Sequence, residues 1–474
     1  MMQPNNSMRT VAINQPTRQV LILLLLLSGV GFLIAGGSRD DIISLLIWRP
    51  LTMLFLAAAL IWGWRQSWSV APFVIGFATF IVFFVMLNLL PMPPQIWTAL
   101  PGREVIAQIY DEAGMNLPWL PISFAPARTW NALFALAAPL AALILALRLS
   151  AIDHAIVVRF LLGIGLLSGL VGLLQAIGPD DSMLYFYRIT NSGEAVGLFA
   201  NRNHQAALIS CLFPLLAAGL ALQRTSPDSL PFYQILAIAA AFFLIPLLLV
   251  TGSRAGVVLG TIGILASFWV YQPPVTTGRA GVAKLMDRRL QAFSVVGIGV
   301  FVVVLTVVAS RAESIRRIVD SDPSEDLRFA ALPVIWSAAW DFFPVGSGVG
   351  SFVETYKIFE PYKLLSPAYL NHAHNEPLEI LLTAGAVGII LIGVAAIAWA
   401  RAAIRLHRDR KPFDRATTTE QVLGRAGAVI CMILALASVA DYPLRVPSLS
   451  ILFAIAVAWV SLSGGDNQSR NSVS

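Results

Sequence analysis

Long apolar runs, separated by short polar segments, make up most of this sequence. A helix that crosses a bilayer needs about 20 mostly apolar residues, and twelve runs come close to that length or reach it. They cover residues 19–37, 43–63, 69–90, 129–149, 155–177, 203–222, 233–251, 255–271, 292–310, 377–400, 425–441 and 447–463. Because the apolar residues are continuous rather than alternating, they predict helices and not strands. The expected fold is an all-α integral membrane protein with about twelve transmembrane helices.

Composition narrows the class further. The chain has 474 residues, of which 57% are hydrophobic and 12% are charged, and soluble domains carry about 25% charged residues. This excludes a cytosolic enzyme, a secreted disulfide scaffold and a disordered protein. Cys211 and Cys431 stand in apolar runs and predict neither a disulfide framework nor a zinc site. The net charge of +6 is typical of basic loops beside a membrane, so no nucleic-acid partner is expected.

The distribution of basic residues predicts the orientation. An even number of helices puts both ends on one side, and short loops rich in Lys and Arg face the cytoplasm. Connections 272–291 and 401–425 are the most basic short loops. Both termini are therefore expected in the cytoplasm, with the long loops 91–128, 178–202 and 311–376 outside it. The predicted parts are a cytoplasmic tail, a membrane domain and a second cytoplasmic tail, at 1–18, 19–463 and 464–474.

Four polar clusters interrupt the apolar pattern on the predicted outer side. They hold Asn201 to His204; Ser253 and Arg254; Asp326 and Arg328, with Pro344, Gly346 and Gly348 downstream; and Asn371 to Glu376. Three of the clusters lead into predicted helices, and a helix N-terminus carries roughly half a positive charge and free N–H groups. Arginine binds phosphate bidentately. The clusters therefore predict an anion-binding site.

Histidine is concentrated in the same clusters. His204, His372 and His374 are three of the five histidines in the chain, and a histidine can take a proton near neutral pH. No third ligand at zinc-like spacing follows the pair His372 and His374, so no metal is expected. Simpler roles stay open, because an arginine at a membrane boundary can anchor lipid headgroups and a lone histidine can be a hydrogen-bonding structural residue.

One motif resembles the signature of the O-antigen ligase and polymerase superfamily. His374-Asn375 is followed by nine residues, Gly385, two residues and Gly388, which is similar to that family's His-Asn signature with its glycine pair. The glycines are expected on one helical stripe with His374, where they would let a neighbouring helix approach closely. Asn375 and Glu376 are expected mainly to cap the helix that follows.

Other motifs of the chain resemble the same family in the same order. Ser253-Arg254 is similar to its Ser-Arg at a helix end, and Arg328 followed by Pro344-x-Gly-x-Gly is similar to its large-loop pattern. Pro101-Gly-Arg103 looks like part of the first outer loop of some bacterial members. The resemblance is close over residues 190–440, with the largest loop at 311–376.

The resemblance implies a GT-C-like glycosyltransferase of the bacterial inner membrane that uses no cofactor. Its donor would be a glycan on undecaprenyl pyrophosphate. The acceptor would be a lipid A–core sugar for a ligase or a growing lipid-linked glycan for a polymerase. The expected catalytic residues are His374, Arg254 and Arg328. The expected substrate-binding residues are Arg202, Asn203, His204, Ser253 and Asn375, and the expected structural residues are Gly385 and Gly388.

Two of these expectations are specific. Arg254 and Arg328 are expected to approach each other and to face the pyrophosphate, and His374 is expected to act on the acceptor hydroxyl while His372 is a loop residue. The complete His-Asn signature favours a ligase over a polymerase. A transporter or flippase with twelve helices is a more distant alternative, but it would carry ionisable residues near the bilayer midplane. Only Arg49, beside Pro50, is a candidate for such a residue.

Overall fold

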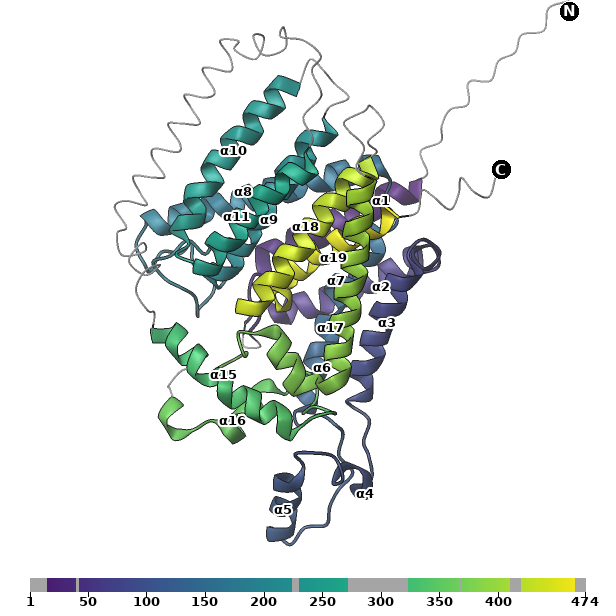
Figure 1. Ribbon diagram of the computed structural model, residues 1–474, viewed down its shortest axis with the longest axis vertical. Helices are drawn as coiled ribbons and strands as arrows, with labels where there is room; N and C mark the ends of the chain where they lie inside the picture. The colour runs from purple at the N-terminus through teal and green to yellow at the C-terminus, as the bar shows by residue number, and fades with distance from the viewer. Residues whose placement is uncertain are drawn as a thin grey trace, which may run out of the picture.

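The computed structural model describes residues 15–39, 42–223, 230–271, 323–365, 369–409 and 419–464 (Figure 1). Every regular element in these ranges is a helix, and an isolated bridge joins Met92 to Leu120. The all-α prediction is therefore confirmed for the described residues. Seven helices are long and apolar enough to cross a membrane, and four shorter apolar helices occupy four more of the predicted runs. The run 292–310 lies outside the described residues, so the count of twelve and the GT-C-like arrangement stay predictions.

The helices form a bundle with a smaller layer at one end. The long bundle helices are α2 (Leu45–Val70), α6 (Pro126–Ala135) continued by α7 (Ala137–Ala146), α8 (Ala151–Ile177), α9 (Arg202–Leu222), α10 (Leu230–Val250), α17 (Glu376–Arg408) and α18 (Thr419–Ala440). The shorter ones are α1 (Gln15–Ile34), α3 (Pro72–Leu87), α11 (Arg254–Val270) and α19 (Pro447–Leu462). Beyond one end of the bundle lie α4 (Pro94–Trp97), α5 (Glu104–Glu112), α15 (Pro323–Asp341) and α16 (Phe352–Phe359) (Figure 1). The 3₁₀ helices are η2 (Tyr362–Leu364) and η3 (Pro443–Arg445).

Helices α9 and α18 form the centre of the bundle. In the most apolar window of α18, 78% of residues are buried, and in that of α9 the share is 67%. Helix α11 packs closely on α9, because Gly256 leaves room for Ala206 where a side chain would clash. The N-terminus of α9 and the C-terminus of α18 therefore meet inside the protein rather than on its lipid-facing surface.

The polar clusters mark where helices α9, α11 and α17 begin. Asn201 accepts a hydrogen bond from a backbone N–H of α9 at 2.8 Å, and Ser253 and Asn375 do the same for α11 and α17 at 3.0 Å each. Such caps stabilise a helix start by satisfying N–H groups that have no partner within the helix. The predicted capping role of Asn375 is confirmed. Ser253 and Asn375, which were expected to bind substrate, use their side-chain oxygens for the caps.

A break in α17 changes the expected role of its two glycines. The backbone at Gly385 has φ +56° and ψ −143°, so the helix is kinked there. The prediction that His374, Gly385 and Gly388 lie on one stripe of a continuous helix is therefore wrong. A β-carbon on Gly385 would lie 2.1 Å from the carbonyl oxygen of Pro344, so a loop packs here instead of a neighbouring helix. Gly388 leaves room for the side chain of Ile380, in the turns of α17 before the kink.

The loop that fills this kink ties the outer layer to α17. The N–H of Ala386 donates to the Pro344 carbonyl, and the N–H groups of Ser347 and Gly348 donate to α17 carbonyls on the other side of the kink, each at 2.9 Å. Arg103 also stabilises this loop. Its guanidinium is buried 4.1 Å from the Phe124 ring and donates to the Gly346 carbonyl at 3.2 Å. The Arg103 motif and the loop at residues 344–348, which are far apart in the sequence, therefore pack together at the kink. We call this contact of the loop with Gly385 the joint.

The kink supports a prediction on stability. Gly385→Val should destabilise the protein by at least about 1–3 kcal/mol, because this backbone conformation is essentially restricted to glycine and the side chain would clash with Pro344. The matched control is Gly393→Ala in the same helix, where a β-carbon meets nothing within 4 Å. The control should be neutral or stabilise by about 0.5–1 kcal/mol. Thermal unfolding in detergent measures both, and equal unfolding temperatures for the two variants would contradict the role of the joint.

Candidate functional site

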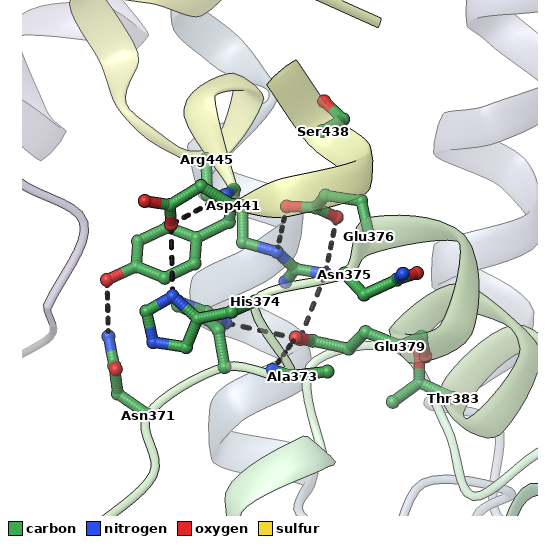
Figure 2. A network of polar contacts seen from close by, with 12 residues as sticks. Asn371, Ala373, His374, Asn375, Glu376, Glu379, Thr383, Ser438, Asp441 and Arg445 are labelled. Carbon is green, nitrogen blue, oxygen red and sulfur yellow. Dashed lines mark hydrogen bonds and ion pairs between the residues drawn. The ribbon is translucent and has the colours of Figure 1, made fainter. Parts of the chain in front are cut away.

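Asp441, directly after α18, is the centre of a polar network that joins three helix ends (Figure 2). His374 meets its carboxylate at 3.1 Å through Nδ1, and Asn203 and Asn201 donate to it at 2.7 Å and 3.3 Å. His204 Nε2 lies 3.8 Å from the same carboxylate. Asp441 is only 4% exposed. Residues that the sequence placed in separate clusters, on α9 and before α17, therefore converge on one carboxylate that it did not single out.

His374 is held in one orientation by this carboxylate. Its backbone has φ +50°, a conformation uncommon outside glycine, and its side chain is almost fully buried. Among the described residues, the His374 ring makes its hydrogen bond through Nδ1. A neutral imidazole that donates from Nδ1 carries its lone pair on Nε2. This arrangement equips His374 to accept a proton at Nε2 while Asp441 stabilises the cation that forms.

Electrostatics support that assignment. Burial lowers the pKa of His374, and the nearby Arg328 and His372 lower it further, although the hydrogen bond to Asp441 opposes them. Burial alone would raise the pKa of Asp441, but the hydrogen bond from His374 and the charges of His204 and Arg328 bring it far below its ordinary value. At neutral pH the pair is therefore a neutral imidazole beside an ionised carboxylate. Arg328, on α15, contributes to both pKa shifts, and its expected role at the pyrophosphate stays a prediction.

A second charged network fixes the first turn of α17. Arg445, in η3, contacts Glu376 at 2.8 Å and 3.0 Å and Glu379 at 3.0 Å. Glu379 also meets His372 Nδ1 at 3.2 Å and accepts the N–H of Ala373 at 2.8 Å. Burial would lower the pKa of Arg445, but the two carboxylates outweigh it and raise the pKa above its ordinary value. His372 does lie in the loop before α17, but its carboxylate partner was not predicted.

The ring of Tyr442 packs against all three histidines of the site. The centroid of its ring lies 4.4 Å from that of His372, 4.8 Å from His374 and 5.1 Å from His204. Burial and the neighbouring Asp441 charge raise the pKa of Tyr442 to about 12, so its hydroxyl stays protonated. That hydroxyl accepts a hydrogen bond from the Asn371 side chain at 3.4 Å. The ring therefore supports the three imidazoles by packing between them.

The expected arginines are in different surroundings. Arg202 is buried and its guanidinium lies 2.5 Å from the Glu194 carboxylate, so a carboxylate already neutralises the charge that was expected to meet substrate. Arg254 is the first residue of α11, whose first turn packs against Ala206 of α9. Its approach to Arg328 stays a prediction. Within the described ranges, no group of three or more His, Cys, Asp or Glu residues is arranged to hold a metal ion.

Part of the chain is similar to a known protein family. A family model described as O-antigen ligase matches residues 239–393. This part of the chain belongs to the O-antigen ligase superfamily. The matched segment contains Arg254, Arg328 and His374, and the match supports a membrane enzyme of the ligase or polymerase type. A comparison with curated proteins finds no match. Asp441 and Arg445 lie beyond the matched residues, although their side chains complete the site.

Proposed function

We propose that this protein moves a glycan from an undecaprenyl-pyrophosphate donor to a sugar hydroxyl at the outer face of the bacterial inner membrane. The observation that carries the proposal is the pairing of His374 with Asp441 beside Arg328, where α9 and α17 begin. A base and a cation in one buried site are what glycosyl transfer with an anionic leaving group requires. We favour a ligase, with a lipid A–core acceptor.

The proposed reaction is a direct displacement. His374 Nε2 takes the proton of the acceptor hydroxyl while that oxygen forms a bond to the anomeric carbon of the donor. The bond from that carbon to the pyrophosphate oxygen breaks, and the electron pair leaves with undecaprenyl pyrophosphate. Asp441 holds Nδ1–H and stabilises the imidazolium, so it is a positioning residue. The proton then passes from the imidazolium to water.

The leaving pyrophosphate needs positive charge. Arg328 lies near the His374–Asp441 pair, and we assign the second contact to Arg254 at the first turn of α11. The N–H groups of a helix start add roughly half a positive charge. Donors arranged in advance around a developing anion are often the largest single contribution to catalysis.

A defined reconstitution separates the alternatives. The purified protein in nanodiscs receives a lipid-linked glycan donor with either lipid A–core or a second lipid-linked glycan as acceptor. A product on lipid A–core supports the ligase, and elongation of the second glycan identifies a polymerase. Movement of intact donor across the bilayer without a covalent product would identify a flippase and contradict glycosyl transfer.

The lowered pKa of His374 predicts the pH dependence. Transfer needs the neutral imidazole, so activity should be lost only as the pH falls below the ordinary histidine value near 6.5. Arg328 contributes to this lowering. Arg328→Gln should therefore raise the pKa of His374 and move the acidic limb of the normalised profile to higher pH. Arg128→Gln, which breaks an ion pair with Glu354, is the control that should leave the limb in place. An unchanged limb in Arg328→Gln would contradict the coupling.

The orientation also makes a direct prediction. A reporter that is active only outside the cytoplasm should give a signal when it is fused at Ser351, between α15 and α16. The reason is that short basic loops are retained in the cytoplasm, whereas long loops cross the membrane. A cytoplasm-specific reporter at the same position is the control, and a signal from it would place the site on the wrong side for a lipid-linked donor.

A further inference from the structure

A pocket separate from the His374–Asp441 pair, and from the arginines assigned to the pyrophosphate, opens at the same end of the bundle as that pair. It has a volume of about 340 Å³ and is lined by residues 33, 34, 39 and 42–44 on one side and by residues 186–189 on the other. Its lining is mostly apolar, with Leu33, Ile43, Phe186 and Ile189, and it includes two cations, Arg39 and Arg188.

The pocket is joined to the Asp441 carboxylate through Tyr187. The Tyr187 hydroxyl accepts the N–H of Gly36 at 2.6 Å, and the Gly36 carbonyl accepts the N–H of Ala200 at 3.1 Å. The next residue is Asn201, which donates to Asp441. This close approach requires glycine, because a β-carbon on Gly36 would lie 2.0 Å from the Leu198 carbonyl oxygen.

The rim of the pocket is joined to the catalytic histidine. Arg39 donates to the Tyr369 hydroxyl at 3.1 Å, and its guanidinium lies 4.9 Å from the centre of that ring. Lys357 Nζ lies 5.8 Å from the same ring. Tyr369 precedes His374 by five residues. A ligand phosphate bound at Arg39 would therefore lie beside the segment that carries the proposed base.

The apolar side of the pocket continues onto a surface that suits hydrocarbon. Ile43 is 84% exposed, and Leu46 and Ile47 in the first turn of α2 are 78% and 68% exposed. An exposed aliphatic surface beside arginines fits a molecule with a hydrocarbon end and an anionic end. Both substrates of the proposed reaction have this chemistry, since the donor and the lipid A acceptor each carry phosphate next to lipid.

We infer that this pocket binds the phosphate-bearing end of a lipid substrate, with the phosphate on Arg39 and Arg188 and the hydrocarbon against Ile43 and Phe186. The inference rests on the proposed function for the identity of the lipid. Its physical basis is the combination of charge-assisted hydrogen bonds from guanidinium groups with burial of hydrocarbon. Its place is set by the links of Gly36 and Arg39 to the two members of the catalytic pair.

Binding to the full chain in neutral-lipid nanodiscs tests the inference without requiring transfer. The probes are lipid A, undecaprenyl phosphate and, as the uncharged counterpart, undecaprenol. The double variant Arg39→Gln/Arg188→Gln should weaken binding of a phosphorylated probe about tenfold or more and leave undecaprenol unchanged. The control Arg128→Gln/Lys363→Gln removes two cations outside this pocket and should bind all probes as the wild type does.

The probes separate the two sources of phosphate. Weaker binding of lipid A alone assigns the pocket to the acceptor, and weaker binding of undecaprenyl phosphate alone assigns it to the donor. Ile43→Asp, at an exposed position, keeps both arginines and should weaken the same probe by charge repulsion. Unchanged binding of both phosphorylated lipids in either variant would overturn the inference. A further outcome is that the wild-type protein binds the phosphorylated lipid but transfers no glycan, while the variants lose that binding. This result would support the pocket and refute only the proposed function.

Discussion

Replacing His374 with alanine should lower glycan transfer by about 10²–10⁴-fold, which is the range for removal of a general base. The fold should survive, because the contacts of Arg445 with Glu376 and Glu379 hold the start of α17 independently of the imidazole. Initial rates with purified lipid-linked donor, at matched protein concentration, give the measurement. The control is His407→Ala, an exposed histidine in the last turn of α17, which should retain the full rate.

Asp441→Asn distinguishes proton transfer from simple packing at this site. The amide keeps the shape of the carboxylate but has no negative charge to hold Nδ1–H or to stabilise the imidazolium, so the rate should fall by a similar factor. His372→Ala should lower the transfer rate far less. Its partner Glu379 still has its ion pair with Arg445 and its hydrogen bond from the N–H of Ala373. Full activity of His374→Ala would transfer the role of base to another group, and Asp326 would be the next residue to test.

Arg328→Lys should lose most activity, by about 10²–10³-fold, although the charge is kept. A lysine ammonium cannot make the paired contact that a guanidinium makes with two phosphate oxygens. Arg254→Lys should show a loss of the same order if both arginines face the leaving group. The rate at saturating donor is the decisive quantity, because loss of a contact to the departing pyrophosphate lowers kcat as well as raising KM.

A matched substitution controls for general effects of replacing arginine. Arg408→Lys changes an exposed arginine in the last turn of α17, remote from the His374–Asp441 pair, and should leave the rate unchanged. Wild-type transfer by Arg254→Lys and Arg254→Ala would return that residue to the role of a headgroup anchor. Wild-type transfer by Arg328→Lys would show that its charge alone is used.

Local patterns of the sequence predicted most helices and the segments that carry the site. Apolar runs need a hydrocarbon environment, and residues such as Asn201 and Ser253 cap helices wherever they occur, so both signals are local. Asp441 gave no such signal, because it is a lone acidic residue at the end of an apolar run. Its partners, Asn203 and His374, are far from it in sequence. Only the packing of α9 and α17 around α18 brings them together.

The kink in α17 was missed for a related physical reason. Gly385 and Gly388 fit a helical pattern, and a glycine within such a pattern is usually tolerated as helix. The conformation at Gly385 is set by the loop at Pro344, which occupies the space of a β-carbon. Likewise, Arg202 fits the local pattern of an anion site, but its buried ion pair with Glu194 could not be predicted from that pattern. In both cases a contact between distant segments outweighed the local pattern.

The joint between Pro344 and Gly385 divides α17 into two mechanical parts. The loop at Pro344 is hydrogen-bonded to the turns before the kink through Ser347 and Gly348 and to the turn after it through Ala386, and α17 also packs with α18 in the bundle. His374 precedes the first part, and Asp441 follows α18. The hydrogen bond between them therefore joins the segment before the kinked helix to the end of α18. The distance between the base and its carboxylate therefore depends on how the start of α17 is held against the end of α18, so a substitution at Gly385 could disturb the pair without contacting either residue.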